Sequence, residues 1–193
     1  MDEPVAARKT ALRRDLRRRR RELGAAQRAR LSGAAVEHLL RLPEVVAART
    51  IALYAATPVE ADPATALDLL RERGVRVVLP RVAGPVLEFV DVTTGSELVP
   101  GFRGLTEPSG PAIDLGQVDV VVVPGVGFDA RGGRLGQGGG HYDRTLPGLR
   151  ADALRVGLAF SVQVVESIPR EARDALLDVT VTELGPLRTH ARA

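Results

Sequence analysis

The sequence predicts an α/β protein in which a mostly parallel sheet is covered by helices, and three observations lead to this class. Segments with helical periodicity alternate with short apolar segments along the whole chain. Residues 118–123 are almost continuously apolar, which is typical of a strand buried on both faces of a parallel sheet. Hydrophobic residues make up 45% of the 193 residues, so the chain can build a core. We expect a single domain over residues 1–193.

Two amphipathic helices open the chain. Leucines recur on one stripe of residues 6–23, and Gly24 ends this helix. Residues 25–42 carry a second apolar stripe, which Pro43 ends. We expect this N-terminal helical pair to pack on the outside of the sheet.

The remaining elements alternate between strand and helix. Residues 63–73 form a helix with Asp62 as its N-cap and Gly74 at its end. Strands are expected at residues 50–55, 75–79 (ended by Pro80), 86–92, 118–123, 155–160 and 179–182. Residues 93–117 are a long connection with a short strand near Leu98. A helix is expected to run from the glycine-rich stretch to Leu149, and a short one over residues 162–167.

The composition excludes several classes of protein. The chain has no cysteine, so disulfides and thiolate metal sites are excluded, and a metal would need oxygen or imidazole ligands. With 3% aromatic residues, the core depends on Leu, Val, Ala and four Phe, among them Phe102. No run approaches about 18 apolar residues, and no signal peptide precedes the first helix. We expect a soluble, cytoplasmic protein without a membrane partner.

The positive charge is carried almost entirely by arginine. The chain has 27 Lys and Arg residues, of which only Lys9 is a lysine, and residues 13–21 hold seven arginines. Such a cluster can bind nucleic acid or an acidic membrane. With Asp15 and Glu22 close by, it can equally be the solvated face of a helix.

The glycine-rich segment after the strand at residues 118–123 has the chemistry of a phosphate cradle. Gly136 and Gly138, Gly139 and Gly140 lead into a helix, so backbone N–H groups can approach an anion closely. Arg134 and Arg144 add positive charge. The segment is neither a Walker A loop nor a spaced dinucleotide motif. The alternative is a flexible surface loop.

Three further residues are candidates for ligand binding. Asp143, one turn into that helix, would need a cation such as Mg²⁺ beside bound phosphates, with Asp174 or Asp178 as a second carboxylate. Lys9 offers a compact charge for a phosphate, and Arg13 lies on the same helical face. Glu60 follows a strand and could accept N–H groups of a heterocycle. Each acid could instead cap or stabilise a turn or helix, and the single lysine could be chance.

Several ordered segments resemble the 5-formyltetrahydrofolate cyclo-ligase family, also called methenyltetrahydrofolate synthetases. The resemblance centres on Pro124–Asp129, Gly133–Gly136 and Gly138–Arg144. It extends over nearly the whole chain through Lys9-x-x-x-Arg13, 54–62, 79–81, Glu107-Pro108, 157–160, Gln163, Pro169, Asp174 and Thr182-Glu183. The number of ordered matches makes this resemblance specific.

The resemblance implies a fold related to the NagB/RpiA/CoA-transferase group and an ATP- and Mg²⁺-dependent ligase. The substrate would be 5-formyltetrahydrofolate, converted to 5,10-methenyltetrahydrofolate by phosphorylation of the formyl oxygen. The ATP contacts would be Lys9, Arg13, Arg134, Gly136, Gln137, Gly138, Gly139, Gly140, His141 and Tyr142, of which Lys9, Arg134 and Tyr142 would take part in catalysis. Asp143 and Asp174 would hold Mg²⁺, and Ala55, Glu60 and His141 would contact folate. Two departures stand out, because members often have Tyr at 141 and a basic or aromatic residue at 137.

Other interpretations remain open at this point. The chain could be a diverged paralogue, or a sugar-phosphate isomerase or CoA transferase of a related fold, which would need no ATP. An RNA-binding protein that uses the arginine cluster ranks lowest, because it leaves the glycine-rich segment without a role, so we do not expect a nucleic-acid partner. We expect a monomer or a weak homodimer.

Overall fold

The computed structural model describes residues 4–92, 98–101 and 106–189, and a seven-stranded sheet forms its centre. The strands are β1 (Thr50–Ala52), β2 (Arg76–Ala83), β3 (Val86–Asp91), β6 (Val120–Val123), β9 (Leu154–Leu158), β11 (Val179–Thr182) and β12 (Gly185–Arg188). Their order across the sheet is β12-β11-β9-β6-β1-β2-β3. The five inner strands are parallel, whereas β3 and β12 pair antiparallel at the two edges. The predicted α/β class with a mostly parallel sheet is confirmed.

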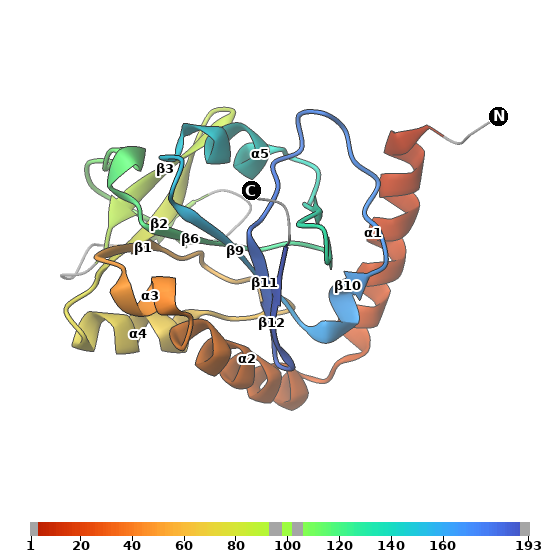
Figure 1. Cartoon of the computed structure of the whole chain (residues 1–193), viewed down its shortest axis with the longest axis horizontal. Coiled ribbons are helices and arrows are strands. Elements are labelled where there is room, and N and C mark those ends of the chain that lie inside the picture. The colour runs from red at the N-terminus through yellow and green to blue at the C-terminus, as the bar shows by residue number, and fades with distance from the viewer. Residues whose placement is uncertain (1–3, 93–97, 102–105, 190–193) are drawn as a thin grey trace.

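Both faces of the sheet are covered. Helices α2 (Ala25–Leu40), α3 (Pro43–Ala47) and α4 (Ala64–Glu72) lie along one face, below the sheet in Figure 1. Val120 and Val122 of β6 belong to the core on that side. Val121 and Val123 point the other way and pack with Phe128. The all-buried β6 therefore behaves as its apolar sequence predicts.

Helix α1 (Val5–Glu22) stands apart from α2, at the edge of the molecule in Figure 1. It covers a three-stranded sheet made of β10 (Val164–Val165), β7 (Gly127–Asp129) and β8 (Arg134–Leu135). Leu16 is completely buried there with Val126, Leu135 and Ile168. The expected helical pair is thus divided, because α2 covers the large sheet and α1 covers the small one.

The prediction that Pro80 ends a strand is wrong, whereas the second helix does end before Pro43, at Leu40. Strand β1 pairs with β2 only as far as Val78, so from Pro80 onward β2 has a partner on one side alone. A residue without an N–H is tolerated there, and β2 continues to Ala83. Pro43 begins α3, where its missing N–H costs nothing.

Two predicted helices are wrong or too long. The helix after the glycines, α5 (His141–Thr145), has one turn and gives way to a 3-10 turn at Leu146–Gly148, since Pro147 cannot donate to the previous turn. Residues 162–167 contain the end of a 3-10 turn (Ser161–Gln163) and then β10, whose two valines pair with β7. β-branched residues fit that pairing better than a helix.

The long connection contains more structure than the sequence predicts. The short strand near Leu98 is β4 (Leu98–Pro100), which pairs with β5 (Thr106–Pro108), and Leu115–Gln117 forms a 3-10 turn. Phe102, expected in the core, lies outside the described residues. In the part of the chain that the structure describes, no helix is long and apolar enough to cross a membrane.

Gly157 in β9 gives a test of this packing. A Cβ atom at Gly157 would lie 2.6 Å from Phe128 Cε1 and 2.9 Å from Leu177 Cδ1, so Gly157→Ala forces core side chains to move. We expect a loss of about 1–3 kcal/mol in the free energy of unfolding, measured by urea denaturation. The matched control is Gly33→Ala in α2, where nothing lies within 4 Å, and which should gain roughly 0.5–1 kcal/mol. Equal effects at the two positions would contradict the close packing around Phe128.

Candidate active site

The candidate residues gather where the inner strands reach their carboxyl ends. The loop after β1 carries Glu60, and the segment after β6 carries the carbonyl groups of Pro124 and Gly125. Helix α1 and the loop between β8 and α5 close over them. Ligands of parallel α/β sheets bind at this edge, so the position suits an active site.

The loop between β8 and α5 has a backbone that only glycine adopts readily. Gly138 has φ +110° and Gly140 has φ +68°, both in the left-handed region. Arg13 Nε donates to the carbonyl oxygen of Gly136 at 2.9 Å, which fixes the loop to α1. Because α5 has only one turn, its attraction for an anion rests on its first free N–H groups rather than on a long helix dipole.

Two carboxylates position Arg134 beside this loop. The buried Asp129 shapes the turn before Arg134, and Asp143 pairs with its guanidinium. Asp129 accepts N–H groups from Arg131, Gly133 and Ile168, and these bonds shape the turn that precedes Arg134. The side chain of Arg134 is only 4% exposed, and its Nη2 lies 2.8 Å from Asp143 Oδ1. A buried cation held this firmly can orient an anionic ligand.

Tyr142 lies against the same guanidinium. The Arg134 Cζ atom is 5.3 Å from the centre of the Tyr142 ring, which is cation–π distance. Desolvation raises the pKa of Tyr142 well above its ordinary value, although Arg134 acts in the opposite direction. At neutral pH the phenol keeps its proton, so Tyr142 can donate a hydrogen bond but cannot serve as a base.

Lys9 reaches across from α1 to the segment before β11. Its Nζ lies 2.5 Å from Asp174 Oδ2 and 3.1 Å from Glu171 Oε2, and its side chain is 10% exposed. Partial burial acts to raise the pKa of Asp174, but the hydrogen bonds from Lys9 and from the Glu171 N–H outweigh it and lower that pKa. The same ammonium lowers the pKa of Glu171.

Arg13 brings the two predicted metal ligands into one neighbourhood. Burial and the nearby Arg17 lower the pKa of Arg13, while Asp174 and Asp143 both act to raise it. Each carboxylate is therefore close enough to Arg13 to influence its charge. Asp178, the other candidate, instead accepts the N–H of Arg155 at the start of β9, away from the site.

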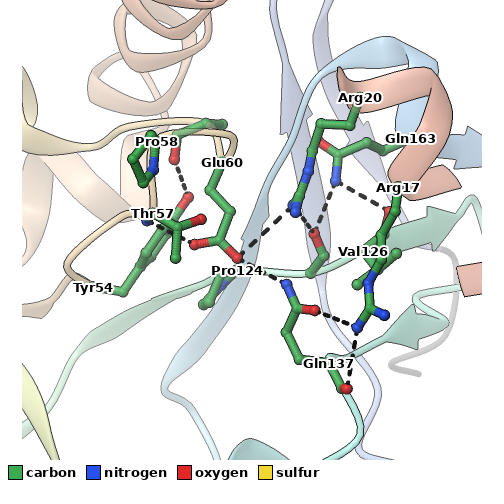
Figure 2. A network of polar contacts seen from close by, with 12 residues as sticks. Arg17, Arg20, Tyr54, Thr57, Pro58, Glu60, Pro124, Val126, Gln137 and Gln163 are labelled. Carbon is green, nitrogen blue, oxygen red and sulfur yellow. Dashed lines mark hydrogen bonds and ion pairs between the residues drawn. The ribbon is translucent and has the colours of Figure 1, made fainter. Parts of the chain in front are cut away.

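Glu60 is the centre of a polar network shown in Figure 2. Its Oε2 accepts the N–H of Thr57 at 3.0 Å, and its Oε1 lies 3.2 Å from Gln137 Nε2. Arg20 approaches the same Oε1 at 3.8 Å, and both charged side chains are buried. The network also holds Arg20 Nη1 against the carbonyl oxygen of Gly125.

Gln163 and Tyr54 complete the surroundings of this network. Gln163 Nε2 donates to the carbonyl oxygens of Gly125 and Val126, which joins the segment after β6 to the turn before β10. The Tyr54 hydroxyl donates to the Ala61 carbonyl oxygen, and burial raises the pKa of Tyr54 well above its ordinary value. Ala55, predicted to contact folate, is half-buried on the strand-end loop that leads to Glu60.

Most of the predicted residues meet here, but the sequence analysis missed the second half of α1. Arg17 contacts Gln137, and Arg20 contacts Glu60. The signal was present in the spacing, since Lys9, Arg13 and Arg17 recur every four residues on one helical face. The arginine cluster is therefore divided, because Arg18 pairs outward with Asp15 and Glu22. His141 begins α5 beside Gly139, next to the loop.

A cleft of about 300 Å³ lies away from these residues and is lined by Arg76, Asp91 and Asp114, among others, near the amino end of β2. No three Asp, Glu or His side chains among the described residues are arranged to hold a metal ion. A metal at Asp143 and Asp174 would thus have two carboxylates and would need further oxygens from a ligand or water.

Comparisons with known proteins converge on one family. The profile of the "5-formyltetrahydrofolate cyclo-ligase family" matches residues 5–183. The chain is similar to the 5-formyltetrahydrofolate cyclo-ligase of Escherichia coli (strain K12), with 36% identity over 86% of this chain and 96% of the relative. The one from Haemophilus influenzae is 32% identical over 88% and 95%.

Solved structures agree with these relatives. The Aquifex aeolicus 5,10-methenyltetrahydrofolate synthetase superposes with a TM-score of 0.85 at 35% identity, covering 96% of this chain and 94% of the other. The Mycoplasma pneumoniae synthetase gives 0.75 at 26% identity, covering 91% and 98%.

The Lys9–Asp174 pair generates a prediction about stability and pH. Because its pKa is lowered in the folded state, Asp174 stabilises the protein above its ordinary pKa near 4, and this contribution is lost as the pH falls through the lowered value. Asp174→Asn should cost about 1–2 kcal/mol of unfolding free energy at pH 7, and the difference should shrink below about pH 4. Urea titrations at several pH values measure it. Asp68→Asn is the control, since Asp68 is 74% exposed and its ion pair with Arg71 is long, at 4.0 Å.

Proposed function

The chain belongs to the 5-formyltetrahydrofolate cyclo-ligase family and is a ligase, and we propose that the site described above binds MgATP beside a folate pocket. The reaction of this family is the ATP-dependent conversion of 5-formyltetrahydrofolate into 5,10-methenyltetrahydrofolate. One observation carries the assignment of the site. The glycine loop is bound by Arg13 and reaches Glu60 through Gln137, and beside it Lys9 pairs with Asp174 and Arg134 pairs with Asp143.

The triphosphate would lie along the loop from Gly136 to Gly140, between α1 and α5. Lys9 and Arg13 approach it from α1, and Arg134 approaches from β8. Within the protein these cations are engaged by carboxylates and carbonyl oxygens. Phosphate oxygens would replace those acceptors, so the charges need only small movements to bind ATP.

Asp143 and Asp174 are the proposed ligands of a divalent ion that would arrive together with the phosphates. Lys9, Arg13, Arg17 and Arg134 face three carboxylates, which leaves a surplus of one positive charge for a polyanion. Asp143 and Asp174 both act to raise the pKa of Arg13, so each lies within electrostatic range of the guanidinium that would contact the phosphates. Carboxylate and phosphate oxygens are the ligands that Mg²⁺ prefers. When bound, Mg²⁺ would neutralise phosphate charge and orient the γ-phosphate.

Folate would enter on the side of Ala55 and Glu60. The Glu60 carboxylate is buried beside Arg20, and carboxylate oxygens can accept the N–H groups of a heterocycle. His141 begins α5 directly after the nucleotide loop, and it would contact one of the two substrates from there.

The proposed chemistry needs no covalent nucleophile from the protein. The oxygen of the N5-formyl group attacks the γ-phosphorus of ATP, and ADP then leaves. N10 then attacks the formyl carbon and loses its proton, and the C–O bond breaks to release phosphate and the methenyl product. Lys9 and Arg134 stabilise charge on the transferred phosphoryl group, and the Tyr142 hydroxyl donates a hydrogen bond. The protein contributes positioning and electrostatics.

Removal of one phosphate-binding cation gives the first test. We expect Lys9→Ala to lower the rate of methenyltetrahydrofolate formation at least about 100-fold, because a charge at the transferring phosphoryl group is lost. The product is followed by its absorbance, with and without MgATP. Arg18→Met, an exposed cation on the same helix, is the control and should keep full activity. Wild-type rates in Lys9→Ala would remove Lys9 from the nucleotide site.

Asp143 tests the metal. Asp143→Ala should abolish turnover at a low magnesium concentration while leaving the far-UV circular dichroism unchanged, because one of two carboxylates that hold the ion is absent. Isothermal calorimetry of ATP binding at increasing Mg²⁺ is the second measurement, and the variant should need more Mg²⁺ than wild type. Full activity and unaltered Mg²⁺ dependence would exclude Asp143 as a ligand.

A further inference from the structure

Gln137 lies in the nucleotide loop, and both the oxygen and the nitrogen of its side-chain amide make contacts. One of these contacts is with Glu60, the acid proposed to bind folate. Gln137 Oε1 accepts a hydrogen bond from Arg17 Nη2 at 2.7 Å, and Gln137 Nε2 lies 3.2 Å from Glu60 Oε1 (Figure 2). Arg17 Nη2 also reaches the backbone oxygen of Gln137 at 3.4 Å. One carboxamide therefore links α1, the loop and the end of β1.

No other residue of this loop can make such a link. Residues 136–140 read Gly-Gln-Gly-Gly-Gly, so Gln137 supplies the only side chain with polar atoms. The other contacts of the loop use its backbone: Arg13 holds the carbonyl oxygen of Gly136, and Arg144 holds that of Gly139. The position of the loop relative to Glu60 thus depends on one side chain.

The contact uses a hydrogen-bonding position that a folate heterocycle would need. Glu60 Oε2 is already bonded to the N–H of Thr57, and Arg20 lies behind Oε1 at 3.8 Å. Gln137 Nε2 is a further donor at Oε1, at 3.2 Å. We take a ligand N–H group to use this acceptor position, so that it competes with the N–H group of Gln137.

We propose that Gln137 is a positioning residue that acts as a latch: it holds the nucleotide loop against Glu60 until 5-formyltetrahydrofolate displaces it. The released loop, with left-handed glycines at 138 and 140, is then free to adjust around the triphosphate. This proposal rests on the proposed function, since it assumes that Glu60 binds the folate.

The latch predicts a coupling between the two substrates. Folate that releases Gln137 prepares the loop for ATP, so each ligand should tighten the binding of the other by the same factor. Without the latch, folate no longer competes with Gln137 and should bind more tightly by itself. Because the contact is long, at 3.2 Å, we assign it the value of an ordinary hydrogen bond, which corresponds to a change of about three- to tenfold in affinity.

The experiment measures the dissociation constant of 5-formyltetrahydrofolate by calorimetry, with and without Mg²⁺ and a non-hydrolysable ATP analogue. In wild type the analogue should tighten folate binding severalfold. In Gln137→Ala, folate alone should bind about three- to tenfold more tightly, and the analogue should add little. Gln137→Asn should behave like Gln137→Ala, because a side chain one methylene shorter cannot span Arg17 and Glu60.

Two further variants separate the latch from a general effect on the loop. Arg17→Met removes one end of the bridge and should change folate affinity in the same direction but by less. Arg18→Met, whose contacts are with Asp15 and Glu22, should leave the coupling unchanged. Amide hydrogen exchange of residues 136–140 should speed up in Gln137→Ala, and in wild type when folate is added.

The outcomes are distinct. Weaker folate binding in Gln137→Ala would overturn the latch and make Gln137 a direct folate contact. Unchanged coupling in Gln137→Ala and Gln137→Asn would also overturn it, while the proposed function stands. If wild type itself binds no folate under either condition, the assignment of Glu60 fails and the latch fails with it.

Discussion

The site depends on a row of four cations along one face of α1. Lys9 pairs with Asp174, Arg13 and Arg17 bind the loop at Gly136 and Gln137, and Arg20 pairs with Glu60, so the four cations contact three segments of the chain. A cation buried in a protein must be paired, since its desolvation otherwise costs several kcal/mol. The pairing therefore determines where α1 lies, and through α1 it determines how the loops around the site are arranged.

The sheet makes this arrangement possible. Parallel strands deliver the ends of β1 and β6 to one edge, so Glu60 and the carbonyl oxygen of Gly125 come together although they are far apart in sequence. The small sheet gives α1 an apolar support through Leu16, which lies between the charged contacts of Arg13 and Arg17. The burial of Leu16 determines how closely α1 approaches the small sheet, and the ion pairs determine which face of α1 is turned toward the site.

The sequence predicted the class of the fold and the glycine loop, because both depend on local patterns. The apolar run of β6 and the glycines at 138–140 are readable without knowledge of their neighbours. The course of β2 through Pro80 was not predictable, since it depends on where β1 ends. The predicted helix to Leu149 is too long, because Pro147 replaces its last part with a 3-10 turn. Local rules fail where a partner strand decides the outcome.

The site residues divide in the same way. Lys9, Asp143 and Glu60 were found from their chemistry and from the family resemblance, but their partners were not. Arg20 belongs to the arginine cluster, for which the sequence predicts a solvated helix face or a nucleic-acid surface. Its side chain is nevertheless only 4% exposed. Only the tertiary structure distinguishes it from Arg18, two residues earlier on the same helix and 58% exposed.

The paired charges have a consequence for selectivity. Lys9, Arg13 and Arg134 each have an acceptor within the protein, so a weak or singly charged anion gains little by displacing one of these acceptors. A triphosphate offers several charged oxygens at once, and it can replace the acceptors of Lys9, Arg13 and Arg134 together while the freed carboxylates remain available to a divalent ion. A site with unpaired cations would attract any phosphate. On the proposed function, the pairing favours a ligand that brings several negative charges together with a divalent ion.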